Sequence, residues 1–172
     1  MKRLFSILSL AILLVFSGCT GDDGALGPVG PPGPESEVFE ITNVNFTATS
    51  YTIRFTFPRP ILDSDHVLIY RLAATDQGED VWRLLPQTYF SPAGSLDFKY
   101  NYDFTRLNTD IFLEGNDLAT LTDQYRINQV FRIVVVPGFS RSRSSIALDL
   151  NDYNAVIKAY GINDKNRTII KL

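Results

Sequence analysis

Hydrophobic and polar residues alternate with a period of two through much of the chain from residue 38 onward. The segment "YTIRFTF" (51–57) places four apolar side chains on one face and three polar side chains on the other. "LDFKYNYDF" (96–104) repeats this pattern over nine residues. Such a period is typical of a strand with one face on a core and the other in water.

Two other segments, "HVLIYRL" (66–72) and "VFRIVVV" (130–136), are nearly continuous apolar runs. Runs of this kind favour central strands that are buried on both faces. "VFEITNVNF" (38–46) alternates, changes phase near Asn43 and alternates again, which indicates a β-bulge. The remaining strands, which bring the total to about eight, are expected at 80–85, 110–115 and 167–172.

Turn-forming residues separate these segments, as in "FPRP", "DQGED" and "SPAG". Strands about 8–15 residues apart favour an antiparallel arrangement over a parallel sheet. The sequence therefore predicts a mainly β protein, an antiparallel β-sandwich of about seven to eight strands with one or two short helices.

The helices are expected at 150–161 and, from a weaker pattern, at 116–125. In the first, apolar residues recur at i, i+3, i+4 and i+7, Asn151 or Asp152 can cap the start, and Gly161 can close the end. We expect each helix to cover an end or an edge of the sandwich.

The first 18 residues have the pattern of a secretory signal peptide. Lys2 and Arg3 precede an apolar run from residue 4 to residue 16, and Ser17-Gly18-Cys19 follows it. A membrane-spanning helix needs roughly 20 apolar residues, so this run is too short to be one. We therefore divide the chain into a signal peptide (1–18), a leader (19–35) and a folded domain (36–172).

Ser17-Gly18-Cys19 after the apolar run resembles the lipobox of bacterial lipoproteins, with Phe16 where leucine is usual. The resemblance implies that the signal is cleaved before Cys19, that the thiol carries a diacylglycerol and that the new amine is acylated. The alternative is a secreted protein with a free thiol. Because Cys19 is the only cysteine, the domain is expected to have no disulfide and to depend on a hydrophobic core.

The leader continues with five triplets, GDD, GAL, GPV, GPP and GPE, whose glycines are Gly21, Gly24, Gly27, Gly30 and Gly33. Glycine at every third position with proline is the collagen pattern, because only glycine fits the axis of three wound chains. A stalk this short favours a monomeric, semi-stiff spacer that reaches about 45 Å. The alternative is a homotrimer assembled through the stalk.

Asp22 and Asp23 follow the cysteine closely and resemble the surface-export signal of lipoproteins in Bacteroidetes-type bacteria. The resemblance implies an outer-membrane lipoprotein that faces the cell exterior, with the periplasmic face as the alternative. A solvated charge pair in the leader is the plainer interpretation of the same residues.

Charge argues against nucleic acid as a partner. Without Lys2 and Arg3 the chain has 14 basic and 19 acidic residues, a formal charge of −5, and the domain alone carries −2. An acidic chain without a basic stripe lacks the electrostatic footprint of nucleic-acid binding.

The residues offer little catalytic chemistry. His66 is the only histidine and would have to serve alone as the base of a triad. Asp63, Asp65 and His66 could ligate a metal, but a solvated strand end is the favoured interpretation. The acids of "DQGED" and "EGND" do not match a calcium loop, and the glycine-rich leader is not a nucleotide loop. We expect no catalytic residue, no metal and no cofactor.

Aromatic residues leave one further hypothesis open. Trp82 and Tyr89 could form a platform for a sugar ring, although a tryptophan in a strand is more often part of a core.

The order of parts, a lipobox, a few collagen triplets and a disulfide-free domain, is similar to that of small collagen-like lipoproteins of Bacteroidetes-type bacteria. That resemblance implies that the protein is located in the cell envelope, and it does not imply any catalysed reaction. The first hypothesis is a membrane-anchored, surface-displayed interaction or structural module that binds an unknown protein or glycan through loops or strand edges. The alternatives are a glycan-binding accessory protein and a cell-envelope hydrolase.

Overall fold

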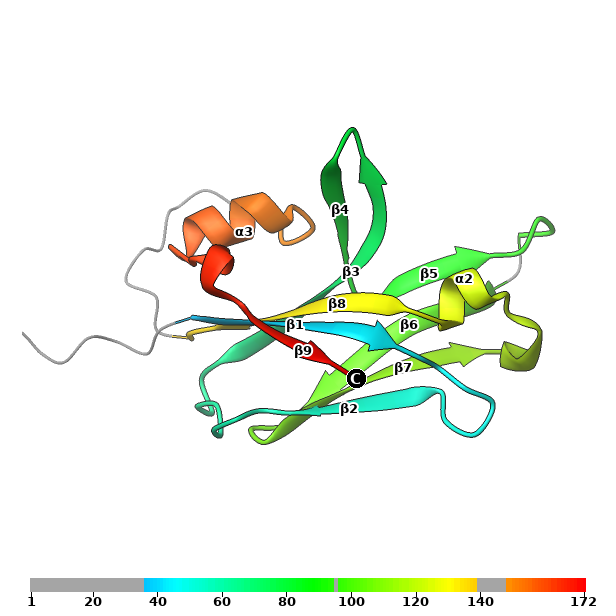
Figure 1. Ribbon diagram of the computed structural model, residues 1–172, viewed down its shortest axis with the longest axis horizontal. Helices are drawn as coiled ribbons and strands as arrows, with labels where there is room; N and C mark the ends of the chain where they lie inside the picture. The colour runs from blue at the N-terminus through cyan, green and yellow to red at the C-terminus, as the bar shows by residue number, and fades with distance from the viewer. Residues whose placement is uncertain (1–35, 95, 139–147) are drawn as a thin grey trace, which may run out of the picture. The chain divides into compact units, whose positions relative to one another are not determined.

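Nine strands form two sheets in the structure, a computed structural model that describes residues 36–94, 96–138 and 148–172 (Figure 1). The first sheet has the order β4-β3-β8-β1-β9, with β1 at Glu37–Val44, β3 at His66–Asp76, β4 at Glu79–Leu84, β8 at Gln129–Val136 and β9 at Thr168–Lys171. The second has the order β2-β7-β6-β5, with β2 at Thr52–Thr56, β5 at Gln87–Phe90, β6 at Leu96–Phe104 and β7 at Asn108–Gly115.

The predicted fold class, a mainly β sandwich, is confirmed, and the alternation seen in the sequence explains it. The apolar positions of each strand pack into a core to which both sheets contribute, including Phe98 and Tyr100 of β6 and Phe131 and Ile133 of β8. Tyr100 and Phe131 meet edge to face with ring centroids 6.1 Å apart. Burial of these side chains is the main source of stability in a domain of this kind.

The apolar runs of β3 and β8 are central in the first sheet, as predicted, because a second layer covers the outer face of that sheet. Helix α3 (Tyr153–Ala159) buries Tyr153 and Val156 there. A second buried cluster includes Tyr153 of the helix and Tyr70, Val134 and Val136 of the sheet. The helix thus lies on a face of the sheet, whereas the sequence predicted an end or an edge.

The capping signals of α3 are confirmed. The Asp152 side chain accepts a hydrogen bond from the backbone N–H of Ala155 at 3.0 Å, and Gly161 follows the helix with φ of +62°. A short 3₁₀ helix, η2 (Asp164–Asn166), precedes β9.

The helix expected at 116–125 is wrong in extent. The structure has a 3₁₀ turn, η1 (Leu118–Thr120), and a single α-turn, α2 (Asp123–Arg126). Leu121 and Thr122 between them adopt extended backbone angles, and the Leu121 side chain is buried in the core. Burial of Leu121 interrupts the helix at the point where the weaker periodicity would have continued it.

Three features of the sheets go beyond the sequence pattern or refine it. The phase change in β1 is a register shift between Ile41 and Val44, and Asn43 has φ of +59°, which confirms the predicted irregularity. The four-residue strand β5 was not predicted. Strand β9 pairs with β1 in parallel, whereas the other pairings among the described strands are antiparallel.

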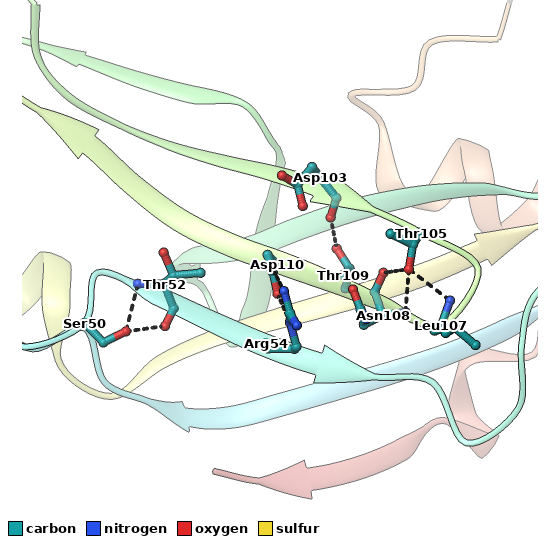
Figure 2. A network of polar contacts seen from close by, with 9 residues as sticks. All are labelled: Ser50, Thr52, Arg54, Asp103, Thr105, Leu107, Asn108, Thr109 and Asp110. Carbon is teal, nitrogen blue, oxygen red and sulfur yellow. Dashed lines mark hydrogen bonds and ion pairs between the residues drawn. The ribbon is translucent and has the colours of Figure 1, made fainter.

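A network of polar contacts on the second sheet includes a two-bond ion pair (Figure 2). Arg54 of β2 and Asp110 of β7 are direct cross-strand partners, with Nε to Oδ1 at 2.7 Å and Nη2 to Oδ2 at 2.6 Å. At the β6–β7 turn, Thr105 Oγ1 accepts hydrogen bonds from the backbone N–H groups of Leu107 and Asn108. These contacts set the register of the sheet from its solvent side.

Candidate functional site

The hairpin of β3 and β4 extends beyond the rest of its sheet and forms an arm, which we define as residues 72–83 (Figure 1). Strand β3 pairs with β8 only as far as Arg71, whereas its pairing with β4 continues to Asp76. Residues 74–80 are all exposed. Because β4 ends the order of the sheet, its outer edge has no strand beside it among the described residues.

A tight turn at Gln77 and Gly78 closes the arm. Both residues have positive φ, +49° and +90°, which is the geometry of a two-residue type I′ hairpin turn. The acids of "DQGED" lie at this tip, at Asp76, Glu79 and Asp80. Within the described ranges no group of three or more His, Cys, Asp or Glu side chains is arranged to hold a metal ion.

The base of the arm contains a buried arginine with neutral partners, the Arg71 cluster, which consists of Arg71, Gln87, Tyr89, Tyr100 and Gln129. The guanidinium donates from Nε to Gln129 Oε1 at 2.8 Å. From Nη1 it donates to the Tyr89 hydroxyl at 3.1 Å and, at 3.5 Å, to Gln87 Oε1. Its carbon lies 4.6 Å from the centroid of the Tyr100 ring. Arg71 is only 5% exposed.

Aromatic rings hold this cluster in position. Tyr89 of the edge strand β5 stacks on Phe98 with centroids 4.6 Å apart and planes 7° from parallel, and Tyr125 lies 5.1 Å from Tyr89. The Tyr100 hydroxyl donates to the backbone carbonyl of Tyr125 at 2.6 Å. Burial raises the pKa of Tyr100, and the positive charge of Arg71 opposes that rise. Tyr100 therefore contributes a neutral aromatic ring that contacts the Arg71 guanidinium.

Trp82 lies on the opposite face of the sheet from Arg71. It packs against the outer cluster with the Arg132 guanidinium carbon 4.0 Å from its ring centroid and Tyr153 at 5.9 Å. Trp82 and Tyr89 are each partly buried, and each belongs to a different cluster. The structure does not bring these two candidate platform residues together.

The Arg132 guanidinium that contacts Trp82 also belongs to a network of charged side chains beside α3. Glu40 Oε2 accepts hydrogen bonds from Nε of Arg132 and from Nε of Arg167, each at 2.8 Å. Asp164 accepts one from the Tyr153 hydroxyl at 3.0 Å, and burial raises the pKa of Tyr153 to about 12. Each cation in this network has a carboxylate partner, which indicates a structural role in joining β1, β8 and the segment before β9.

The candidate metal ligands of the 63–66 segment do not converge. Asp63 forms an exposed ion pair with Arg106 at 3.2 Å, and His66 is exposed at the start of β3. Asp65 is buried, and its Oδ2 accepts a hydrogen bond from the backbone N–H of Leu62 at 2.9 Å. Its Oδ1 has no partner among the described residues.

The leader, with Cys19, the glycine triplets from Gly21 to Gly33 and the pair Asp22 and Asp23, lies outside the described residues. No helix in the part of the chain that the structure describes is long and apolar enough to cross a membrane.

Comparison with known proteins adds no relative. No protein-family model matches the chain, and no curated protein or solved structure is significantly similar to it. The candidate site therefore depends on the geometry of this chain alone.

Sequence reasoning missed Arg71 and its cross-strand neighbour Arg83. The sequence contained one signal that could have identified Arg71. It is the only arginine, lysine or acidic residue in the apolar segment "HVLIYRL". The partners of Arg71 lie 16, 18 and 58 residues along the chain, so the sequence alone does not group them.

Proposed function

We propose that this protein is a lipid-anchored lipoprotein of the outer membrane that displays a non-catalytic interaction module on the cell exterior. The leader supports the anchor, since the Ser-Gly-Cys segment follows a short apolar run with a basic start. Acylation at more than one position would hold the protein firmly on its membrane, because the binding free energy grows with each buried methylene.

In this proposal the glycine triplets serve as a monomeric spacer between the anchor and the β-sandwich head. Five triplets with proline bias the backbone toward polyproline II and reach about 45 Å. That length is sufficient to carry the head clear of the lipid headgroups. Asp22 and Asp23 support display toward the exterior through their resemblance to an export signal.

The β3–β4 arm is the observation that carries the proposed interaction function. It extends past the last residue that pairs with β8, and it ends in seven consecutive exposed residues, 74–80. An edge strand presents backbone donors and acceptors in a row, and an extended segment of a partner can pair with such a row. The proposed partner is therefore a protein that docks on the arm.

The anchor is tested by metabolic labelling with palmitate. We expect the wild-type protein to be labelled and to sediment with membranes, and the Cys19→Ala variant to be unlabelled and released. A wild-type protein with an unmodified thiol, detected by mass spectrometry, would overturn the lipoprotein proposal.

The arm is tested by photo-crosslinking in intact cells of the native organism. A crosslinking amino acid replaces Thr75 on the arm or, as a matched control, Thr56 on β2, since both are exposed threonines in strands. We expect a discrete protein adduct from position 75 and none from position 56. Equal adducts from both positions, or none from position 75, would contradict docking on the arm.

A further inference from the structure

Two arginines face the same side of the hairpin at the base of the arm. Arg71 of β3 and Arg83 of β4 are direct cross-strand partners in an antiparallel pair. Directly opposed residues project to the same face of a sheet, with Cβ atoms about 5 Å apart. Like charges in such a position repel each other, so the pair is unfavourable unless an anion lies beside it.

Neither arginine has a carboxylate partner among the described residues. Every ion pair found there is formed by another lysine or arginine. Arg71 uses Nε and Nη1 in hydrogen bonds to neutral acceptors, and none of the bonds between described residues uses its Nη2. Arg83 is exposed. A buried cation is normally paired, because removing a charge from water is costly. Arg71 departs from that rule.

The Tyr89 hydroxyl adds a donor at the same place. It accepts hydrogen bonds from Gln87 Nε2 at 2.7 Å and from Arg71 Nη1 at 3.1 Å. A phenol oxygen has two acceptor positions and one proton, so this hydroxyl is left as a donor. The strand register thus sets Arg83 opposite Arg71, the Tyr89 hydroxyl contacts Arg71, and the described neighbours of Arg71 supply no anion.

We propose that Arg71, Arg83 and Tyr89 form a carboxylate-binding site, and that the carboxylate is an acidic side chain of a partner segment that adds to β4 as a new strand. This inference rests on the proposed docking function of the arm. Guanidinium groups are the preferred side-chain donors for carboxylates because their planar fork can bind both oxygens.

The charge pattern along β4 favours a peptide over a free anion. Residues Glu79, Val81 and Arg83 share one face, since they alternate with Asp80, Trp82 and Leu84, and Trp82 and Leu84 pack on the other face. A strand paired with β4 would place its own alternate side chains opposite these three. The complementary segment therefore carries a cation, an apolar residue and a carboxylate at every second position.

The proposal is tested with fluorescein-labelled peptides and the full-length lipoprotein in detergent, by fluorescence polarisation. The peptide TKTVTET has the complementary pattern, and its reverse, TETVTKT, covers the opposite strand direction. We expect one of the two to bind, and replacement of its glutamate by glutamine to weaken binding by about tenfold or more. Binding of oligogalacturonate with no binding of either peptide would overturn the peptide assignment in favour of an acidic glycan.

Arg83 is the residue to change first, because its exposed side chain can be replaced without disturbing the core. Arg83→Gln is expected to weaken binding of the preferred peptide by about tenfold, whereas Lys165→Gln, which removes an exposed charge from η2, should leave it unchanged. The charge swap is decisive. Arg83→Glu should prefer TKTVTKT over the peptide that binds the wild type.

Arg71→Gln is expected to weaken binding of the preferred peptide at least as much as Arg83→Gln does. If the Arg71 variant fails to fold, the Arg83 variants still test the proposal. Binding that is unchanged by Arg83→Gln would overturn the carboxylate site. If the adduct from position 75 persists in that case, the docking function stands and only the carboxylate site falls. If the adduct is absent in the wild type, the docking function itself falls.

Discussion

The guanidinium carbon of Arg132 lies 4.0 Å from the centroid of the Trp82 ring, although their strands, β8 and β4, are separated in the sheet by β3. The two side chains meet on the outer face of the sheet, where Tyr153 of α3 also approaches the cation at 5.1 Å. Trp82 is the only tryptophan in the chain, so its fluorescence reports on this contact. It is therefore a built-in probe of the packing between the helix and the sheet.

We predict that Glu40→Gln lowers the free energy of unfolding by about 3 kcal/mol, because Asp164 at 3.5 Å is then the only carboxylate left beside the buried Arg132 among the described residues. Urea unfolding followed by Trp82 fluorescence measures this loss. Glu114→Gln is the matched control, since it breaks a half-exposed pair with Lys99 and should have a much smaller effect. Equal losses from the two variants would contradict a buried network.

We predict that Ile133→Ala costs between about 2 and 5 kcal/mol of unfolding free energy. Ile133 is fully buried at the centre of β8, so truncation removes apolar contacts and leaves a cavity. Ile169→Ala makes the same chemical change on the edge strand β9, where the side chain is 60% exposed, and should cost less than about 0.5 kcal/mol. Denaturant midpoints of the two variants measure the difference, and similar values would show that β8 is not the central strand.

Asp110 should titrate below its ordinary pKa of 3.8, because the hydrogen bonds from Arg54 favour the carboxylate. A lowered pKa in the folded state means that the pair contributes stability above the unfolded pKa and loses it as the pH falls through the folded pKa. Carboxyl resonances followed by NMR between pH 2 and pH 6, roughly the titration range of an aspartate, give the value directly.

The control for this titration is Arg54→Gln, which should move the pKa of Asp110 back toward 3.8. An Asp110 pKa that is the same in the two proteins would show that the two-bond ion pair does not persist in solution.

At the tip of the arm, Gly78→Ala should destabilise the hairpin by about 1 kcal/mol. A Cβ at this position meets nothing within 4 Å, so the cost comes only from the φ of +90°. Gln77→Asn is expected to strengthen the turn slightly, because asparagine followed by glycine is the preferred type I′ pair. Hydrogen exchange of the arm amides measures both effects, and faster exchange in Gln77→Asn would contradict the assigned turn.

Much of the fold was predictable because it depends on local patterns. The apolar faces of 51–57 and 96–104, the phase change near Asn43 and the end signals of α3 all express steric and hydrophobic preferences over a few residues. The order of the strands was not predictable. The parallel pairing of β9 with β1 joins segments about 130 residues apart, and its energy depends on side chains from several strands at once.

The candidate site, like the order of the strands, was not predictable from local patterns. Arg71 was visible in an apolar segment, but its hydrogen-bond partners on β5 and β8 and its opposition to Arg83 follow from pairing and register. Trp82 is a second example, because the sequence left a sugar platform open beside the favoured core interpretation, and the tertiary structure packs this side chain against the cluster that includes Tyr153 of α3.

The alternating strands, the capped helix and the pattern of the leader can all be read from the chain, because each depends on spacing between near neighbours. The opposition of Arg71 and Arg83 without a carboxylate partner among the described residues, and the extension of the β3–β4 hairpin past its last pair with β8, emerge only when the strands pair. Strand pairing brings together residues whose separation along the chain carries no information about their distance in space.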